Sequence, residues 1–261
     1  MGIVYRALDT RDDRVVALKL MQTRFTEDAT AVRRFRLEAS LVATLDHPNI
    51  CAVHEVGESG DGRLYLVMPL YEGETLRQRL MRGRLPVDEA IGVALQVARG
   101  LASAHGQGVI HRDIKPSNIF VSNGGSVTLL DFGIAKLAGV TLTGSVAGPL
   151  GTIAYMSPEQ LRGDPLDART DLWSLGVVLY EMLAGQRPFG HGAVGVLVNA
   201  IVHADPVPLS TYQPDLPPAL SSVVGTALSK SSATRFESAQ AFEAALLAVD
   251  GHHTPRGEST E

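Results

Sequence analysis

The residues best suited to chemistry lie in one short stretch, His111-Arg112-Asp113-Ile114-Lys115-Pro116-Ser117-Asn118. Asp131 follows Asn118 by 13 residues and opens the triplet Asp131-Phe132-Gly133. A positioned carboxylate such as Asp113 can orient or deprotonate a hydroxyl group, and Lys115 offers a positive charge two residues away. Asn118 and Asp131 carry oxygen atoms of the kind that Mg²⁺ prefers in proteins. Residues of these types could bind a divalent cation and act on a hydroxyl group.

Further motifs stand on both sides of this stretch in a defined order. Upstream are Val16-Ala17-Leu18-Lys19 and then Glu38, and downstream are Ser157-Pro158-Glu159 and Asp171-Leu172-Trp173-Ser174-Leu175-Gly176. One such motif could arise by chance, but six in this order and spacing extend over nearly the whole chain. The sequence therefore resembles the catalytic domain of the eukaryotic-like (Hanks-type) serine/threonine protein kinases of bacteria.

The resemblance implies a role for each charged residue of the set. Asp113 would orient or deprotonate the substrate hydroxyl, Lys115 would reach the transferring phosphate, and Asn118 and Asp131 would bind Mg²⁺ or Mn²⁺. Lys19 would hold the α- and β-phosphates of ATP and pair with Glu38. The competing interpretation of each residue is a structural ion pair or a surface charge. We expect transfer of the γ-phosphoryl group of ATP to Ser or Thr hydroxyls of protein substrates.

The same resemblance implies where the adenine base would bind. Val4, Ala17 and Phe120 would enclose the base with apolar surface, and Met68 would lie at the back of the pocket. Pro69-Leu70-Tyr71 would form the hinge between two lobes. Proline at position 69 keeps its carbonyl oxygen and lacks only the N–H, so the contact from that carbonyl remains available, and the Tyr71 N–H would supply a second one.

Serine and threonine residues of the segment after Asp131 suggest regulation. The 23 residues between Gly133 and Ser157 include Thr141, Thr143 and Thr152. In the family this segment is the activation loop, and Arg112 would pair with a phosphate added there. We expect autophosphorylation at Thr141 or Thr143, and we expect Thr152 to line the protein-docking part near Asp113. Each threonine also has the simpler interpretation of an ordinary loop residue.

Other residues of the resemblance are expected to be structural. Glu159 and Arg235 would form a buried ion pair, Asp171 would brace the catalytic loop, and His111 with Phe132 would stack in an apolar column that links the lobes.

The chain departs from the family pattern at its start. The family's loop is Gly-x-Gly-x-x-Gly-x-Val, and here only Gly2 and Val4 of Met1-Gly2-Ile3-Val4 match its last part. Losing two backbone contacts to phosphate, each worth roughly 1.5–3 kcal/mol, would weaken binding or transfer by about 10²–10⁴-fold. We expect Met1 to be internal to a longer protein that supplies the missing strand and glycines. The alternative is a weakly active or inactive nucleotide-binding pseudokinase or scaffold module.

The remaining pattern predicts an α+β fold of two lobes. Residues 1–70 read as a small antiparallel sheet with one helix at 27–45 and strands at 5–8, 15–20, 50–56 and 64–68. Residues 73–250 read as a larger, mostly helical lobe with helices at 87–107, 172–183, 193–203, 218–228 and 239–249. The hinge falls at 68–72, the kinase domain spans 1–250, and 251–261 is a flexible tail.

Composition narrows the function classes. The 261 residues have a formal net charge of −5, which disfavours nucleic-acid binding as the main function. Cys51 is the single cysteine, so no disulfide can form within the chain, and a cytoplasmic location is expected. The sequence has no apolar run long enough to span a membrane, although a membrane tether in a longer parent chain stays open. By analogy with bacterial relatives, a homodimer is also an expectation.

Overall fold

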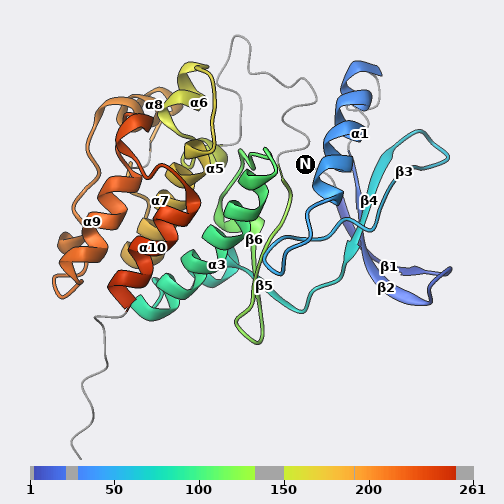
Figure 1. Cartoon of the computed structure of the whole chain (residues 1–261), viewed down its shortest axis with the longest axis horizontal. Coiled ribbons are helices and arrows are strands. Elements are labelled where there is room, and N and C mark those ends of the chain that lie inside the picture. Colours follow the sequence, from blue (N-terminus) through green and yellow to red (C-terminus); the bar gives the residue numbers. More distant parts are fainter. Residues whose placement is uncertain (1–2, 22–28, 133–149, 191, 251–261) are drawn as a thin grey trace, which may run out of the picture.

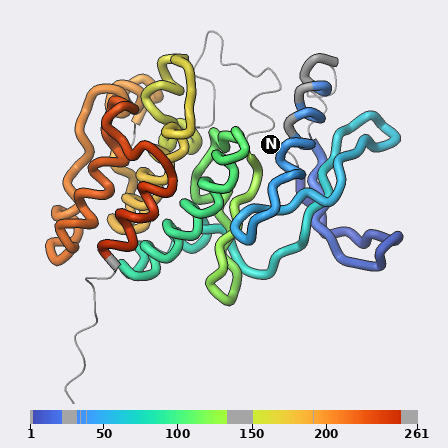
Figure 2. Tube along the Cα trace, in the orientation of Figure 1, coloured from blue at the N-terminus to red at the C-terminus, as the bar shows by residue number. Residues whose placement is uncertain are grey.

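The computed structural model describes residues 3–21, 29–132, 150–190 and 192–250, and it folds into two lobes of unequal size (Figure 1). The smaller lobe contains an antiparallel sheet and the helix α1 (Ala29–Ala43), and the larger lobe is mainly helical. The trace in Figure 2 shows the N-terminal segments at one end of the molecule and the C-terminal helices at the other. The predicted α+β, two-lobed fold is confirmed.

The sheet of the small lobe has the strand order β1-β2-β4-β3, with β1 (Ile3–Asp9), β2 (Arg14–Leu20), β3 (Glu55–Glu58) and β4 (Leu64–Pro69). Asp9 starts the β1–β2 turn by accepting a hydrogen bond from the Arg11 N–H at 3.1 Å, and Asp13 completes it with a φ of 50°. Short polar side chains tolerate this left-handed conformation. The polar stretch 9–14 therefore folds into the predicted turn.

The helix α1 packs its apolar stripe on this sheet, with Phe35, Ala39 and Val42 buried. The predicted helix at 27–45 agrees with α1 to within two residues at each end.

The predicted strand at 50–56 is wrong for most of its length, because β3 begins only at Glu55. Residues 49–51 instead bond to the large lobe. The Cys51 N–H donates to the Leu129 carbonyl at 2.9 Å, and the Leu129 N–H donates to the Asn49 carbonyl at 2.8 Å. Residues 49–51 therefore connect the two lobes and do not form a strand of the small-lobe sheet.

A second, three-stranded sheet lies in the large lobe and was not predicted from the sequence. It has the order β5-β6-β7, with β5 (Gly73–Thr75), β6 (Ile119–Ser122) and β7 (Val127–Leu129). Thr75 also caps the short helix α2 (Leu76–Leu80), and the 3₁₀ turn η2 (Pro116–Asn118) leads directly into β6. This sheet fixes Asn118 before β6 and Asp131 after β7.

Helix α7 (Arg169–Ala184) forms the centre of the large lobe, and 13 of its residues are buried. It packs against α3 (Val87–Gly106), α9 (Pro218–Ala227) and α10 (Ala239–Asp250). Gly176 permits the close approach of α9, because a Cβ atom there would lie 2.7 Å from the Cβ atom of Ala227. The other helical elements are α5 (Leu150–Ile153), α6 (Pro158–Arg162), α8 (Val194–His203), η3 (Leu209–Thr211) and η4 (Ser232–Thr234). The five helices predicted for this lobe are confirmed.

Candidate functional site

The loop before β6 gathers a carboxylate, an ammonium group, an amide and a hydroxyl. The Asp113 Oδ2 atom accepts hydrogen bonds from the Lys115 Nζ at 2.8 Å and from the Asn118 Nδ2 at 3.0 Å. The Lys115 Nζ also donates to the Thr152 Oγ1 of α5 at 3.3 Å. The Asp113 side chain is 12% exposed, so it is not completely enclosed by protein. Four residues singled out in the sequence thus form one hydrogen-bonded group.

The backbone of this loop is held by Asp171, which is fully buried in the first turn of α7. Its carboxylate accepts hydrogen bonds from the backbone N–H groups of His111 at 2.8 Å and of Arg112 at 2.7 Å. Arg112 has a φ of 62°, a conformation that costs a non-glycine residue energy unless its surroundings hold it. The His105 Nε2 atom adds a third contact to Asp171 at 2.8 Å. The predicted bracing role of Asp171 is confirmed, whereas His105 was missed.

His111 has a second function that the sequence did not reveal. Its Nε2–H donates to the Leu130 carbonyl at 3.0 Å, and its Nδ1 accepts from the Asp113 N–H at 3.3 Å. Both bonds require a neutral ring with its proton on Nε2. Burial lowers the pKa of His111 and favours this neutral form. The ring also packs against Phe132 in a tilted arrangement, with a centroid separation of 4.5 Å and an interplanar angle of 38°, in agreement with the predicted contact between these two residues.

Lys19 and Asp131 face each other across the two lobes. The Lys19 Nζ lies 2.5 Å from the Asp131 Oδ1, and the two side chains are 14% and 34% exposed. Asp131 has a φ of 54°, in the left-handed region that a non-glycine residue adopts at a cost in energy unless its surroundings hold it. Glu38 belongs to α1, but its side chain lies outside the described part of the chain, so its pairing with Lys19 stays a prediction.

The register of the small sheet assembles the expected base site. Lys19 lies opposite both Val4 of β1 and Leu66 of β4, and Ala17 lies opposite Met68. Directly opposite residues share a face, as do residues two apart in one strand. Val4, Ala17, Lys19 and Met68 therefore project from the same face, which is the face that meets Asp131.

The segment expected to form the hinge, 68–72, begins in the last residues of β4, which ends at Pro69. The Tyr71 ring lies 5.8 Å from the Phe120 ring of β6, centroid to centroid. Burial, together with the neighbouring Cys51 thiol, raises the pKa of Tyr71, and burial raises the pKa of Cys51 to about 11. The thiol is therefore protonated at neutral pH, in agreement with a structural role for Cys51 rather than a reactive one.

The oxygen atoms suited to a divalent cation come from Asn118 and Asp131. The Leu130 N–H donates to the Asn118 backbone carbonyl at 2.8 Å, so the residue before Asp131 is tied to Asn118. The Asn118 amide nitrogen faces Asp113, which turns the side-chain oxygen of Asn118 the other way. One amide oxygen and one carboxylate suit Mg²⁺, which keeps several ligands from water and phosphate. Among the described residues, no cluster of three or more His, Cys, Asp or Glu side chains could hold a metal.

The segment from α5 to α7 forms a platform beside Asp113, and hydrogen bonds to its neighbours hold it in place. The Tyr155 hydroxyl donates to the Glu181 Oε2 at 2.6 Å, and the Gln160 Nε2 donates to the Arg112 carbonyl at 3.1 Å. Neither contact was predicted from the sequence. Burial raises the pKa of Glu181 above its ordinary value, so its hydrogen bond from Tyr155 compensates for a carboxylate removed from water.

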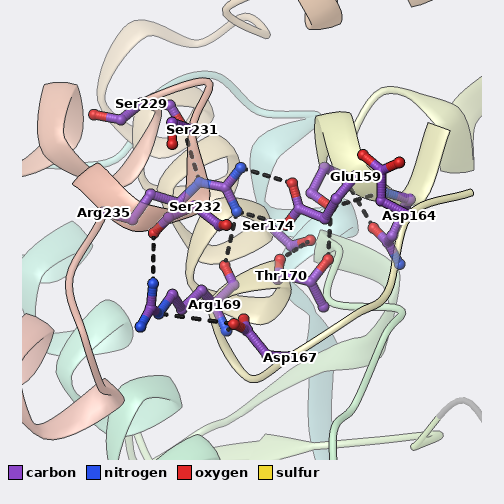
Figure 3. Close-up of polar contacts among 12 residues, drawn as sticks. Glu159, Asp164, Asp167, Arg169, Thr170, Ser174, Ser229, Ser231, Ser232 and Arg235 are labelled. Atoms are coloured by element: carbon purple, nitrogen blue, oxygen red, sulfur yellow. Dashed lines mark hydrogen bonds and ion pairs between the residues drawn. The ribbon is translucent and has the colours of Figure 1, made fainter. Parts of the chain in front are cut away.

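The predicted ion pair between Glu159 and Arg235 anchors this platform (Figure 3). Two parallel hydrogen bonds of 2.6 and 2.7 Å join the Arg235 guanidinium to the Glu159 carboxylate. The remaining donors of Arg235 bond to the carbonyl oxygens of Ser229, Arg169 and Lys230. The Arg235 side chain is fully buried, and the prediction of a buried pair is confirmed.

Gly2, Thr141 and Thr143 lie outside the described residues, and so does the predicted tail at 251–261. Arg112, the expected partner of a loop phosphate, is described and lies next to Asp113. In the described part of the chain, no helix is both long and apolar enough to cross a bilayer.

The family model and the relatives that match this chain are all protein kinases. The family model described as "Protein kinase domain" matches residues 1–247. The chain is 43% identical over 270 residues to serine/threonine-protein kinase PknA of Mycobacterium tuberculosis, covering 100% of this chain and 61% of that protein. It is 42% identical over 252 residues to serine/threonine-protein kinase PknL of the same species, covering 94% and 62%. Serine/threonine-protein kinase pkn3 of Myxococcus xanthus is 41% identical over 263 residues, covering 96% and 48%. The chain thus spans about three fifths of the length of the two mycobacterial relatives and about half that of pkn3.

Proposed function

Because this chain belongs to the protein kinase domain family, we propose that it transfers the γ-phosphoryl group of ATP to serine or threonine hydroxyls of proteins. The observation that carries the proposal is the hydrogen-bonded group of Asp113, Lys115, Asn118 and Thr152. The proposal treats residues 1–250 as one domain with small and large lobes at 1–70 and 73–250 and a hinge at 68–72.

Asp113 is proposed to receive the substrate hydroxyl. Its Oδ2 is fixed by Lys115 and Asn118, and its backbone N–H is fixed by His111. A carboxylate with one fixed rotamer can hold a hydroxyl in line with a phosphate and accept its proton as the new P–O bond forms. Lys115 places a positive charge beside the same position, where negative charge gathers on the transferring group.

Lys19 and Asp131 are proposed to bind the nucleotide phosphates and the divalent cation, respectively. In the structure each charge neutralises the other at 2.5 Å. When ATP and Mg²⁺ bind, Lys19 would exchange the carboxylate for phosphate oxygens, and Asp131 would exchange the ammonium group for the cation. Both charges stay paired in either state, so neither is left uncompensated in a partly buried position. The bound cation neutralises phosphate charge, which is its contribution to the reaction.

The base is proposed to bind between Ala17 and Val4 on one side and Phe120 on the other, with Met68 behind it. The Pro69 carbonyl and the Tyr71 N–H would contact the base from the hinge. The shared sheet face of Val4, Ala17 and Met68 supports this arrangement. Gly2 and Glu38 are proposed to contact the phosphates and Lys19, as the family resemblance implies.

We also propose the identity of the metal ion, the cellular location, the oligomeric state and the phosphorylation sites. The oxygen ligands of Asn118 and Asp131 favour Mg²⁺, and Mn²⁺ could take its place. Dependence on ATP and a single reduced thiol support a cytoplasmic location. The exposed apolar side chains of α1, Leu37 and Leu41, support a homodimer through the small lobe. Thr141 and Thr143 are proposed autophosphorylation sites, with Arg112 as the phosphate partner and Thr152 in the docking segment.

The proposal is tested by incubating the chain with γ-labelled ATP and Mg²⁺, alone and with a generic basic protein. Acid hydrolysis of the labelled protein then identifies the phosphorylated amino acid. We expect label on phosphoserine or phosphothreonine only. Label on phosphotyrosine, or transfer to small molecules in place of protein, would overturn the assignment. Lys19, Asp113 and Asp131 are all present, which supports a working enzyme over an inactive scaffold.

A further inference from the structure

The side chain of Lys230 binds the C-terminal end of helix α8. Its Nζ donates to the carbonyl oxygens of Ile201 at 2.7 Å and of Ala200 at 3.3 Å, both in the last turn of α8. The last carbonyl groups of a helix lack partners within the helix, and a positive charge there is favourable. The lysine ammonium group carries three N–H donors, so it can bond to both carbonyl oxygens at once.

The same ammonium group lies on aromatic rings. Its Nζ is 3.9 Å from the centroid of the Phe189 ring and 5.1 Å from that of the Trp173 ring. These two rings are stacked at 5.6 Å with an interplanar angle of 4°, and the Arg235 guanidinium lies 5.0 Å from Trp173. Cation and ring contacts of this kind favour the charged forms of the two basic residues. Trp173 of α7 thus connects the Lys230 contact with the Glu159–Arg235 pair.

Lys230 is partly buried. Burial lowers its pKa to about 8, the charge of Arg235 acts in the same direction, and Asp205 just after α8 opposes both. An ammonium group taken out of water in this way has to be compensated by the carbonyl and ring contacts that it makes.

Helix α8 in turn packs against the platform formed by the segment from α5 to α7. It packs against α5, which carries Thr152, and against α6, which carries Gln160. Thr152 bonds to Lys115, and Gln160 bonds to the backbone of Arg112. Val196 on the first turns of α8 is 64% exposed, so the helix presents apolar surface close to this platform. None of the contacts of Lys230 involves Ala17, Lys19 or Met68 of the base site.

We propose that Lys230 is a positioning residue for protein substrates, which fixes α8 so that α8 and α5 form one docking surface beside Asp113. This inference rests on the proposed function. It assigns to Lys230 an effect on the protein substrate and none on ATP, because its contacts run to the platform and not to the small lobe.

The test compares steady-state kinetics of the wild type with Lys230→Met, which keeps an apolar stem on the rings and removes the charge and its hydrogen bonds. We expect KM for a protein substrate to rise about 10-fold, as for the loss of one charge-assisted hydrogen bond, and KM for ATP to change less than 2-fold. Lys230→Arg can still donate to both carbonyl oxygens and stack on the rings, so it should restore KM for the protein to within about 3-fold. Arg99→Met is the matched control, because Arg99 pairs with Glu243 where α3 meets α10, away from α8.

The outcomes distinguish a failure of the proposed kinase function from a failure of the proposed role of Lys230. No transfer by the wild type to any protein would refute the proposed function. Normal transfer with unchanged KM for protein in Lys230→Met would refute the role of Lys230 alone. Equal increases in both KM values, or a failure of Lys230→Arg to rescue, would mean that the residue supports the fold in general. If Lys230→Met does not fold, Lys230→Gln, which keeps a donor without the charge, takes its place in the same assay.

Discussion

Replacing Arg235 by Met should destabilise the large lobe more than any surface substitution. The Glu159 side chain is only 8% exposed, and the change removes its two guanidinium bonds of 2.6 and 2.7 Å (Figure 3). It also leaves the carbonyl oxygens of Ser229, Arg169 and Lys230 without the donors they now have. Removing one partner of a buried ion pair costs about 3–5 kcal/mol, so we expect a loss of that size in the free energy of unfolding.

Urea unfolding followed by tryptophan fluorescence measures this loss directly. Trp173 is the only tryptophan, and its ring centroid lies 5.0 Å from the Arg235 guanidinium, so its emission reports on the same region. The midpoint should move to lower urea, while the slope of the transition, which follows the surface exposed on unfolding, should stay the same. The control is Arg99→Met, whose exposed pair with Glu243 should contribute at most about 1 kcal/mol.

The double variant Glu159→Leu with Arg235→Met separates the pair from simple packing. Removing both charges avoids an uncompensated buried ion, so the double variant should be more stable than the sum of the two single losses predicts by about 2 kcal/mol or more. Single losses below about 1 kcal/mol, or losses that simply add, would refute the argument that the pair anchors this lobe.

Three other predictions follow from charges and burial. Because burial raises the pKa of Cys51 from 9.0 to about 11, the native thiol at pH 8 should react with a disulfide reagent about 100-fold more slowly than the unfolded chain from its ionisation alone; equal rates would contradict its burial. Lys19→Met should weaken ATP binding about 10–100-fold in a calorimetric titration, whereas unchanged affinity would remove Lys19 from the nucleotide site. Burial alone would raise the pKa of Glu159, but the bonds and charge of Arg235 outweigh it and lower that pKa. The ion pair should therefore contribute its stability above about pH 4.5 and lose it as the pH falls through the lowered value. Wild type should lose stability in acid more steeply than Glu159→Gln, which has no carboxylate to titrate at this position, and the same acid dependence in both would contradict this.

Much of the fold follows from apolar periodicity in the sequence. The stripe of α1 and the continuous apolar run of α7 predicted both helices, because long patterns carry a strong signal. The sheet of β5, β6 and β7 was not predictable, since strands of three or four residues show too little alternation. Residues 50–54 have strand-like composition, but tertiary bonds to Leu129 determine their conformation.

The site was predictable to a different extent. The motif order identified Asp113, Lys115, Asn118 and Thr152, and the structure brings these four together. The sequence motifs could not reveal that His111 is neutral and supports the Asp113 backbone, or that Tyr155 bonds to Glu181. The Tyr155–Glu181 contact joins residues far apart in the chain, and the burial that keeps His111 neutral depends on how the large lobe packs rather than on any local pattern.

The central claim is that Asp113 receives the hydroxyl that takes the phosphoryl group. The most direct measurement is single-turnover transfer from γ-labelled ATP by Asp113→Asn beside the wild type, with ATP affinity measured on the same samples. We expect transfer to fall about 10²–10⁴-fold, while ATP affinity changes less than about 3-fold because Lys19 and Asp131 remain. Transfer by Asp113→Asn at the wild-type rate would contradict the account.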